Sequence, residues 1–186
     1  MTNPTTIIFE SHATSTDNEA GLSSGHNDVA LSELGVAQAK ELGKRRQNEH
    51  FDAIFCSDLQ RSYRTAELAF GVALPVVKDP RLRECNYGGL TQRPASEVEA
   101  QKAAHIHEPF PRGESYADTM VRMRSFLDDL GRDYSGKRVM IIGHRATQYG
   151  LEHWLNHVPL AQTVTAPWSW QPGWEYALAQ NYPAYL

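Results

Sequence analysis

The chain has 186 residues, of which 41% are hydrophobic, so it is long enough to bury one sizeable core and short for two. Its 18 Lys and Arg residues are outnumbered by 22 Asp and Glu residues. The sequence contains no run of basic residues, so it gives no support for a nucleic-acid-binding surface. The only cysteines, Cys56 and Cys85, are too few for a disulfide framework and lack the spacing of a zinc or redox motif, so we expect free thiols.

The N-terminal residues 1–5 are polar and carry no cationic segment. The apolar run at residues 7–9 is far too short for a signal sequence or a membrane span. We therefore expect a cytoplasmic protein that does not interact with membranes.

The first predicted strand covers residues 6–9. Ser32 can cap a following helix that ends at Arg45 and Arg46, two cations that suit the C-terminal end of a helix dipole. A second strand is predicted over residues 53–55, and Asp58 can cap a second helix running to Gly71. Residues 74–77 form the third predicted strand.

The helical pattern weakens in residues 90–112, where an alanine-rich helix over 96–105 is flanked by prolines, and we expect this insertion to cover the site as a lid. Ser115 and Asp118 resemble a capping box that starts a long helix, which is followed by a strand over residues 139–142. Thr147 is expected to open the last helix. The alternation of strands and helices predicts an α/β fold with a mainly parallel sheet.

Three tryptophans gather near the C-terminus among Pro and Gly residues: Trp168, Trp170 and Trp174. Such a cluster can stack on a ligand or cover a core. We favour the core.

Chemically competent side chains follow the strands or stand in the first turn of the next helix: His12, Arg61, Glu84 and His144. In open α/β sheets, ligands bind outside the carboxyl ends of the strands, where the backbone N–H groups of helix starts favour anions. These side chains are therefore expected to converge on one anion-binding edge, which an isolated structural His or Arg would not do.

Several segments resemble those of the histidine phosphatase superfamily, the phosphoglycerate mutase-like enzymes. They occur in the family's order: Ser11 to Asn18, Gly25 to Ala39, Ser57 to Ala66, Leu82 to Gly88, Gly113 to Ser115, and Gly143-His144. The resemblance covers most of the chain and implies one domain over residues 1–186, folded as a three-layer α/β sandwich around a mainly parallel sheet.

The resemblance also implies a role for each residue of the site. His12 would attack phosphorus and form a phosphohistidine, while Arg61 and His144 would hold the phosphate oxygens. Glu84 would protonate the leaving oxygen and then activate water, with Arg83 pointing away from it. Further phosphate contacts are expected from Ser11, Ser15 and Asn18.

No cofactor or metal is expected. The closest candidate for a metal site, His105 and His107 near Glu108, lacks further ligands.

Ser11 departs from the family pattern, which has an arginine before the nucleophile. The loss of such a charge from a transition-state clamp typically costs on the order of 3 kcal/mol. Arg145, directly after His144, is the expected replacement because its guanidinium can fork onto two phosphate oxygens. A structural alternative is a buried ion pair between Arg145 and Glu10, which would explain why a carboxylate stands in an apolar strand.

The sequence thus predicts a metal-independent phosphomonoester hydrolase acting on a small phosphorylated metabolite. Phosphoglycerate mutase-type phosphoryl transfer is one alternative. A second is a pseudophosphatase that binds a phosphorylated ligand without turnover, with Ser11 as the mark of decay. The substrate, the oligomeric state and the pathway are left open by the sequence.

Overall fold

The computed structural model describes residues 3–71 and 74–179 of the chain. One sheet forms the centre, with strands in the order β3-β2-β4-β1-β5. The strands are β1 (Thr5–Ser11), β2 (Ala53–Cys56), β3 (Val76–Lys78), β4 (Arg138–Gly143) and β5 (Trp174–Leu178). All neighbouring strands are parallel except β5, which pairs antiparallel with β1.

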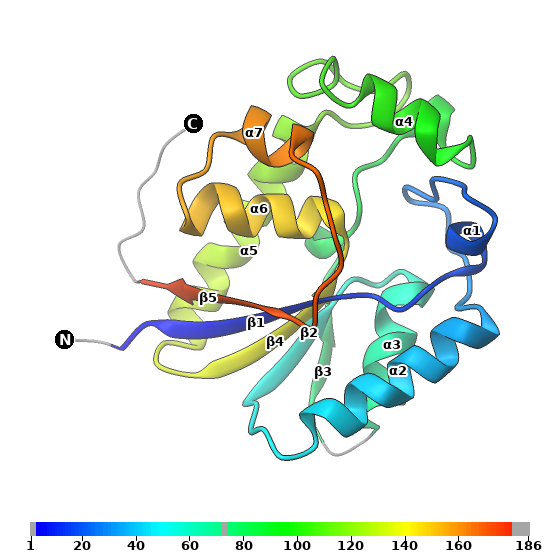
Figure 1. Ribbon diagram of the computed structural model, residues 1–186. Helices are drawn as coiled ribbons and strands as arrows, with labels where there is room; N and C mark the ends of the chain where they lie inside the picture. The colour runs from blue at the N-terminus through cyan, green and yellow to red at the C-terminus, as the bar shows by residue number, and fades with distance from the viewer. Residues whose placement is uncertain (1–2, 72–73, 180–186) are drawn as a thin grey trace.

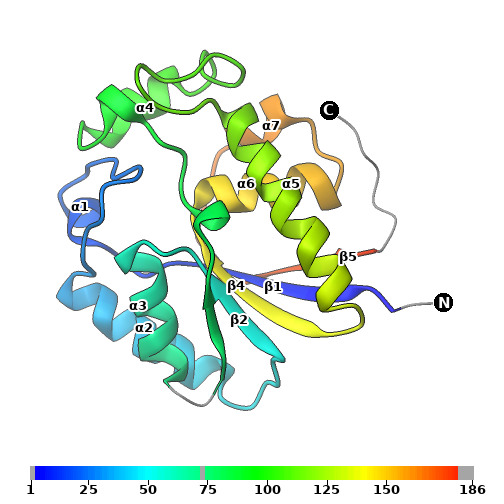
Figure 2. The same cartoon turned by 180° about the vertical axis from the view of Figure 1, so that it is seen from behind.

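Helices cover both faces of the sheet, as Figure 1 and the reverse view in Figure 2 show. One face carries α2 (Glu33–Arg46) and α3 (Gln60–Phe70). The other carries α5 (Tyr116–Asp133), α6 (Arg145–Leu155) and α7 (Leu160–Thr165). Short elements lie beyond the carboxyl ends of the strands: α1 (Thr16–Glu19), α4 (Ala95–Gln101) and the 3-10 turns Pro80–Leu82 and Gly88–Leu90.

The alternation of side chains along β1 supplies both halves of the core. Ile7 and Phe9 are buried against the layer of α5 and α6, whereas Ile8 is buried against α2 and α3. Glu10 continues the pattern of Ile8, so its side chain points to the α2 layer. The sheet is therefore buried on both faces, as a parallel sheet requires.

Most of the predicted elements are confirmed, with shifted boundaries. Ser32 and Ser115 cap α2 and α5 as expected. The third strand is displaced toward Lys78, and the lid helix is Ala95–Gln101, shorter than the predicted 96–105. Two caps were predicted wrongly: Leu59 is the N-cap of α3, and α6 begins two residues before Thr147.

The C-terminal part was predicted incompletely, since α7 and β5 follow α6. The tryptophans there divide into two groups. Trp174 packs on Phe9 in the core cover, with 5.7 Å between the ring centroids. Trp168 stacks on Trp174 with 6.2 Å between the ring centroids, so it extends this cover. Trp170 is 58% exposed, and the expectation that it covers the core is wrong.

Candidate active site

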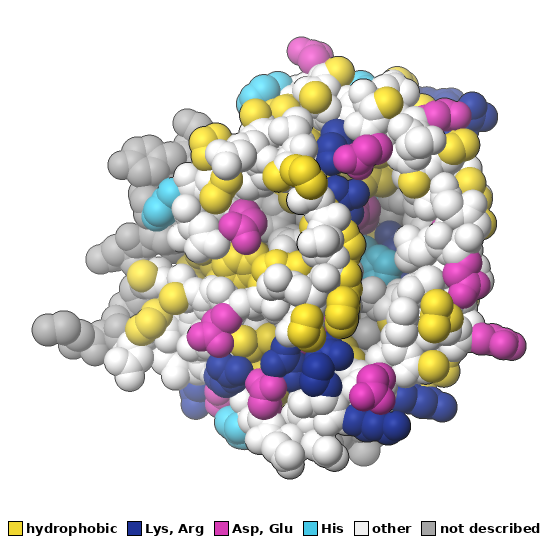
Figure 3. Space-filling model, viewed as in Figure 1, with side chains coloured by type: hydrophobic (Ala, Val, Ile, Leu, Met, Phe, Trp, Pro, Cys, Tyr) yellow, Lys and Arg dark blue, Asp and Glu magenta, His cyan; other side chains and the backbone are white. Residues whose placement is uncertain are grey.

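The carboxyl edge of the sheet brings together His12, Arg61, Glu84 and His144, as the sequence predicted. His12 follows β1 and His144 follows β4, and these strands pair in register up to Ser11 and Gly143. The two imidazole rings lie with their centroids 4.9 Å apart. In the space-filling view of Figure 3, the surface near the centre is hollowed beside a histidine.

Hydrogen bonds fix the nucleophile candidate His12. Its backbone N–H donates to Gly143 O at 3.0 Å, and its ring Nδ1 lies 2.8 Å from Ala13 O. A carbonyl only accepts, so Nδ1 carries the proton and Nε2 keeps a free lone pair. Burial, followed by the charge of Arg61, lowers the pKa of His12 to about 3, so the ring is neutral at physiological pH.

His144 is buried and held by Ser57, whose Oγ lies 2.7 Å from Nε2. The Ser57 hydroxyl also accepts a hydrogen bond from Leu59 N. The other ring nitrogen of His144, Nδ1, has no hydrogen-bond partner among the described residues. Burial and the charge of Arg61 place the pKa of His144 well below its ordinary value. Ser57 stands in a motif quoted above, but sequence reasoning assigned it no role.

Arg61 is almost fully buried in the first turn of α3. It donates to the backbone carbonyls of Asn27 and Gly25 at 3.0 and 2.7 Å, and its other N–H groups remain for a ligand. Gly25 has a φ of +50°, a conformation that favours glycine and turns this carbonyl toward the guanidinium. The carboxylate of Asp58, three residues before Arg61, pairs with Arg83 at 2.6 Å.

Glu84 is buried beside the histidines. Its Oε1 accepts hydrogen bonds from Cys85 N at 2.8 Å and Ala146 N at 3.2 Å, which orient the carboxyl group. Arg83 turns away to Asp58, as expected.

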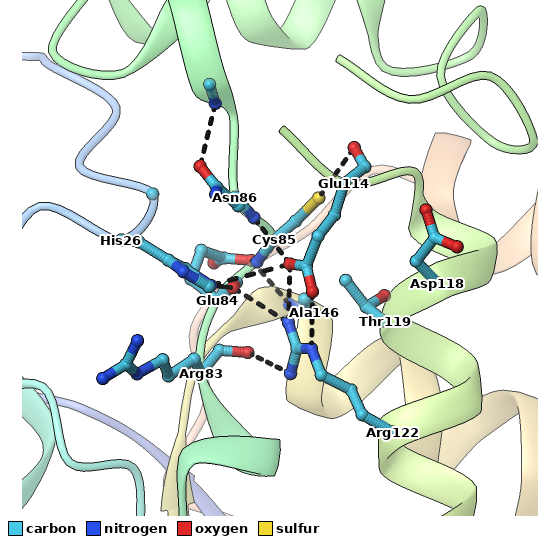
Figure 4. Close-up of polar contacts among 12 residues, drawn as sticks. His26, Arg83, Glu84, Cys85, Asn86, Glu114, Asp118, Thr119, Arg122 and Ala146 are labelled. Atoms are coloured by element: carbon cyan, nitrogen blue, oxygen red, sulfur yellow. Dashed lines mark hydrogen bonds and ion pairs between the residues drawn. The ribbon is translucent and has the colours of Figure 1, made fainter. Parts of the chain in front are cut away.

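Arg122, on α5, directs its guanidinium toward the backbone around Glu84 (Figure 4). Its guanidinium donates to the carbonyls of Arg81, Arg83 and Glu84 at 2.6 to 2.9 Å. It also pairs with Glu114 at 3.1 Å. Sequence reasoning missed Arg122, since nothing local in its helix distinguishes it from a surface arginine.

The expected phosphate ligands after His12 do not all reach the site. Ser15 is fully buried, and its hydroxyl is engaged with Asn18 Oδ1 and Asn18 N as the cap of α1. The prediction that Ser15 contacts phosphate directly is therefore wrong. Its hydroxyl positions Asn18 instead. Asn18 is left with its NH₂ group as the donor that an anion can use.

Two hollows meet at His12. The outer groove, of about 540 Å³, is lined by Ser11, Thr14, Arg45, Trp168 and Trp170, among others. The lid cavity, of about 160 Å³, lies under α4 and is lined by Arg61, Tyr87, Glu99, Lys102 and Tyr116, among others. Both include His12, Asn18, Glu84 and Arg145.

Arg145 does not pair with Glu10, so that structural alternative is wrong. Glu10 points to the α2 layer and binds Arg45 and Arg46 at 3.0 and 2.7 Å. Arg145 starts α6 on the opposite layer, where its Nη1 lies 3.3 Å from Glu99 of the lid. Its Nε is buried with no hydrogen-bond partner among the residues that the structure describes.

Comparison with known proteins decides the family. A model of the histidine phosphatase superfamily (branch 1) matches residues 7–169. The chain belongs to the histidine phosphatase superfamily. The family assignment made from the motifs is thus confirmed.

Individual relatives of the superfamily include phosphatases and mutases. Phosphoserine phosphatase 1 of Hydrogenobacter thermophilus is 33% identical over 147 residues, covering 74% of this chain and 70% of that protein. "Probable phosphoglycerate mutase GpmB" of Erwinia tasmaniensis is 35% identical over 147 residues, covering 74% and 68%. The solved structure of YhfR from Bacillus stearothermophilus has a TM-score of 0.75 at 25% identity and covers 90% and 88% of the two chains. The predicted α/β fold is confirmed.

A metal site would require several side chains that could bind one ion together. In residues 3–71 and 74–179, no cluster of three or more His, Cys, Asp or Glu is arranged as a metal site. His105 instead binds Glu108 O at 3.0 Å and stacks on Phe110. In the same part of the chain, no helix combines the length and apolarity needed to cross a membrane.

Proposed function

We propose that the protein is a metal-independent phosphomonoester hydrolase that forms a phosphohistidine on His12 Nε2. The observation that carries the proposal is the state of His12: a neutral ring whose Nδ1–H is held by Ala13 O, beside a buried arginine. A neutral imidazole with a free lone pair can attack phosphorus in line and divide the transfer into two easier steps. The substrate is a small phosphorylated metabolite, and the buried free thiols Cys56 and Cys85 suit the reducing cytoplasm.

The phosphate oxygens in this mechanism face fixed donors. Arg61 supplies N–H groups, His144 supplies Nδ1–H, and Asn18 supplies its amide. Such groups are held in place before the reaction, so they stabilise the loose transition state without reorganising. Arg145 lines both hollows together with His12 and compensates for the uncharged Ser11.

Glu84 carries the protons. In the first step its carboxyl proton goes to the leaving oxygen as the P–O bond breaks and the bond from His12 Nε2 to phosphorus forms. In the second step the Glu84 carboxylate takes a proton from water, whose oxygen attacks phosphorus and releases His12 and phosphate. Both steps balance without a cofactor.

Rapid quenching in alkaline denaturant, followed by acid treatment of a parallel sample, tests the proposal. Wild-type protein mixed with a ³²P-labelled phosphomonoester is expected to carry an acid-labile, alkali-stable label on His12. His12→Asn should lose the label and the turnover together, while exhaustive chelation should leave both intact. Substantial turnover in His12→Asn, or loss of activity on chelation that zinc or magnesium restores, would contradict the mechanism. Tight phosphate binding without label or turnover would favour a pseudophosphatase, and transfer of the label to a second metabolite would favour a mutase.

A further inference from the structure

The lid cavity is lined by three cationic side chains, those of Arg61, Arg145 and Lys102, and by two acidic ones, those of Glu84 and Glu99. Tyr87 and Tyr116 also line it. Arg61 and Arg145 stand on the side shared with His12, whereas Lys102 comes from the lid, directly after α4. A third cation under the lid is available to a part of the substrate other than the reacting phosphate.

Lys102 is an unusual lysine because its side chain is only 6% exposed. Its Nζ is buried, and its partner within the described residues is a single carboxylate. An ammonium group that loses its hydration is destabilising unless charged or polar partners replace the water. Its ion pair is with Glu99, one turn earlier in the same lid helix.

The Glu99 carboxylate lies between two cations of the cavity. One oxygen pairs with Lys102, and the other lies 3.3 Å from Arg145 Nη1. Desolvation alone would raise the pKa of Glu99, but the nearby charges of Lys102 and Arg145 lower it, so the group is ionised at neutral pH. The Glu99 side chain is also 52% exposed, which leaves it free to turn toward solvent.

We propose that Lys102 forms a subsite for a second anionic group of the substrate, a carboxylate or a second phosphate, whose position the Glu99 carboxylate occupies in the free protein. The inference rests on the proposed function, since it places the phosphoryl group at His12. It narrows the substrate class to compact phosphomonoesters that carry a second anionic group. The small volume of the lid cavity, about 160 Å³, excludes bulky groups from this subsite.

A purely structural latch is the competing explanation, because the contact between Glu99 and Arg145 also ties α4 to α6. The two explanations differ in what a change at Lys102 does. A latch affects every substrate equally through the position of the lid. A subsite affects substrates according to whether they carry the second anion.

The test compares 3-phosphoglycerate with glycerol 3-phosphate, which has a hydroxymethyl group in place of the carboxylate. Wild-type protein should have the higher kcat/KM on 3-phosphoglycerate. Lys102→Met should reduce this preference by about tenfold to a hundredfold, the range for losing one charge-assisted hydrogen bond. Lys137→Met is the matched control, because Lys137 is 56% exposed and precedes β4 at the opposite edge of the sheet. This control should keep the wild-type preference.

Glu99→Gln should act in the opposite direction, since it removes the competing carboxylate and lowers KM for 3-phosphoglycerate. Glycerol 1,3-bisphosphate distinguishes the source of the anion: a preference for it over 3-phosphoglycerate identifies a phosphate. Equal losses on all substrates in Lys102→Met, or no wild-type preference for either substrate that carries a second anionic group, would overturn the subsite.

Calorimetric binding of the same ligands separates this inference from the proposed function. If His12 is never phosphorylated, the proposed mechanism fails. The binding preference and its loss in Lys102→Met still test the subsite, and an absent preference in binding would overturn it.

Discussion

Single side chains at the site owe their chemistry to partners distant in the chain. The proton on His12 is placed by the carbonyl of its neighbour, but its neutrality comes from burial and from Arg61 in another helix. His144 is oriented by Ser57, 87 positions earlier. The protonation and orientation of the two histidines therefore depend on neighbouring side chains from other elements, which the local sequence reveals only in part.

Glu84→Gln tests the role of the carboxyl group. A good aryl leaving group needs little protonation, whereas an alkoxide leaves poorly without it. We expect kcat on alkyl phosphates to fall by at least about a hundredfold, and far less on p-nitrophenyl phosphate. Steady-state kinetics on both substrate types measures the difference. Equal losses would remove Glu84 from the acid role.

Arg145→Ala tests whether this residue compensates for Ser11. Using p-nitrophenyl phosphate, which has no second anion, isolates its effect on the reacting phosphate. We expect kcat/KM to fall by roughly a hundredfold, the scale for a lost bidentate clamp, with unchanged circular dichroism. Adding Ser11→Arg in that background should restore part of the loss. An unchanged kcat/KM would show that Arg145 does not stabilise the transition state of phosphoryl transfer.

At the scale of elements, the segment that carries Glu84 is bound to α5 in addition to its own local hydrogen bonds. Arg122 satisfies three carbonyls of residues 81–84 and the Glu114 carboxylate at once. His26 adds a bond to Glu84 O at 2.8 Å from the loop before α2. The position of the acid therefore depends on packing between elements (Figure 4).

Arg122→Met should be destabilising, because it leaves these carbonyls and Glu114 without their buried partner. We expect the free energy of unfolding to fall by about 3 kcal/mol, within the range for breaking a buried charged pair. Urea denaturation measures it, with Arg132→Met as the control because Arg132 is 66% exposed in the same helix. A loss no larger than the control's would mean that Arg122 does not brace the segment.

For the whole molecule, the buried neutral histidines link folding to pH. The folded-state pKa values of His12 and His144 lie below the unfolded value, so the unfolded chain binds more protons once the pH falls under about 6.5. The contribution of His12 is fully present above that pH and is lost progressively toward pH 3, and that of His144 is lost in the same direction. Each histidine can contribute a slope of up to about 1.4 kcal/mol per pH unit.

Urea denaturation between pH 7.5 and 5 should therefore show stability falling with pH, in a window above the titration of ordinary carboxyl groups. His12→Asn should make this dependence shallower, because it removes one of the groups that titrate on unfolding. A slope unchanged by the substitution would contradict the low pKa of His12.

The sequence by itself determined the alternation of strands and helices, because apolar periodicity and caps such as Ser32 and Ser115 act within a few residues. It also identified His12, Arg61, Glu84 and His144, because the carboxyl ends of parallel strands meet at one edge. Only the tertiary structure decided the partners. Glu10 binds Arg45 and Arg46 because strand alternation sends it to the α2 layer, away from Arg145. Ser57, Arg122 and Lys102 became visible through contacts between elements far apart in the chain, which no local pattern encodes.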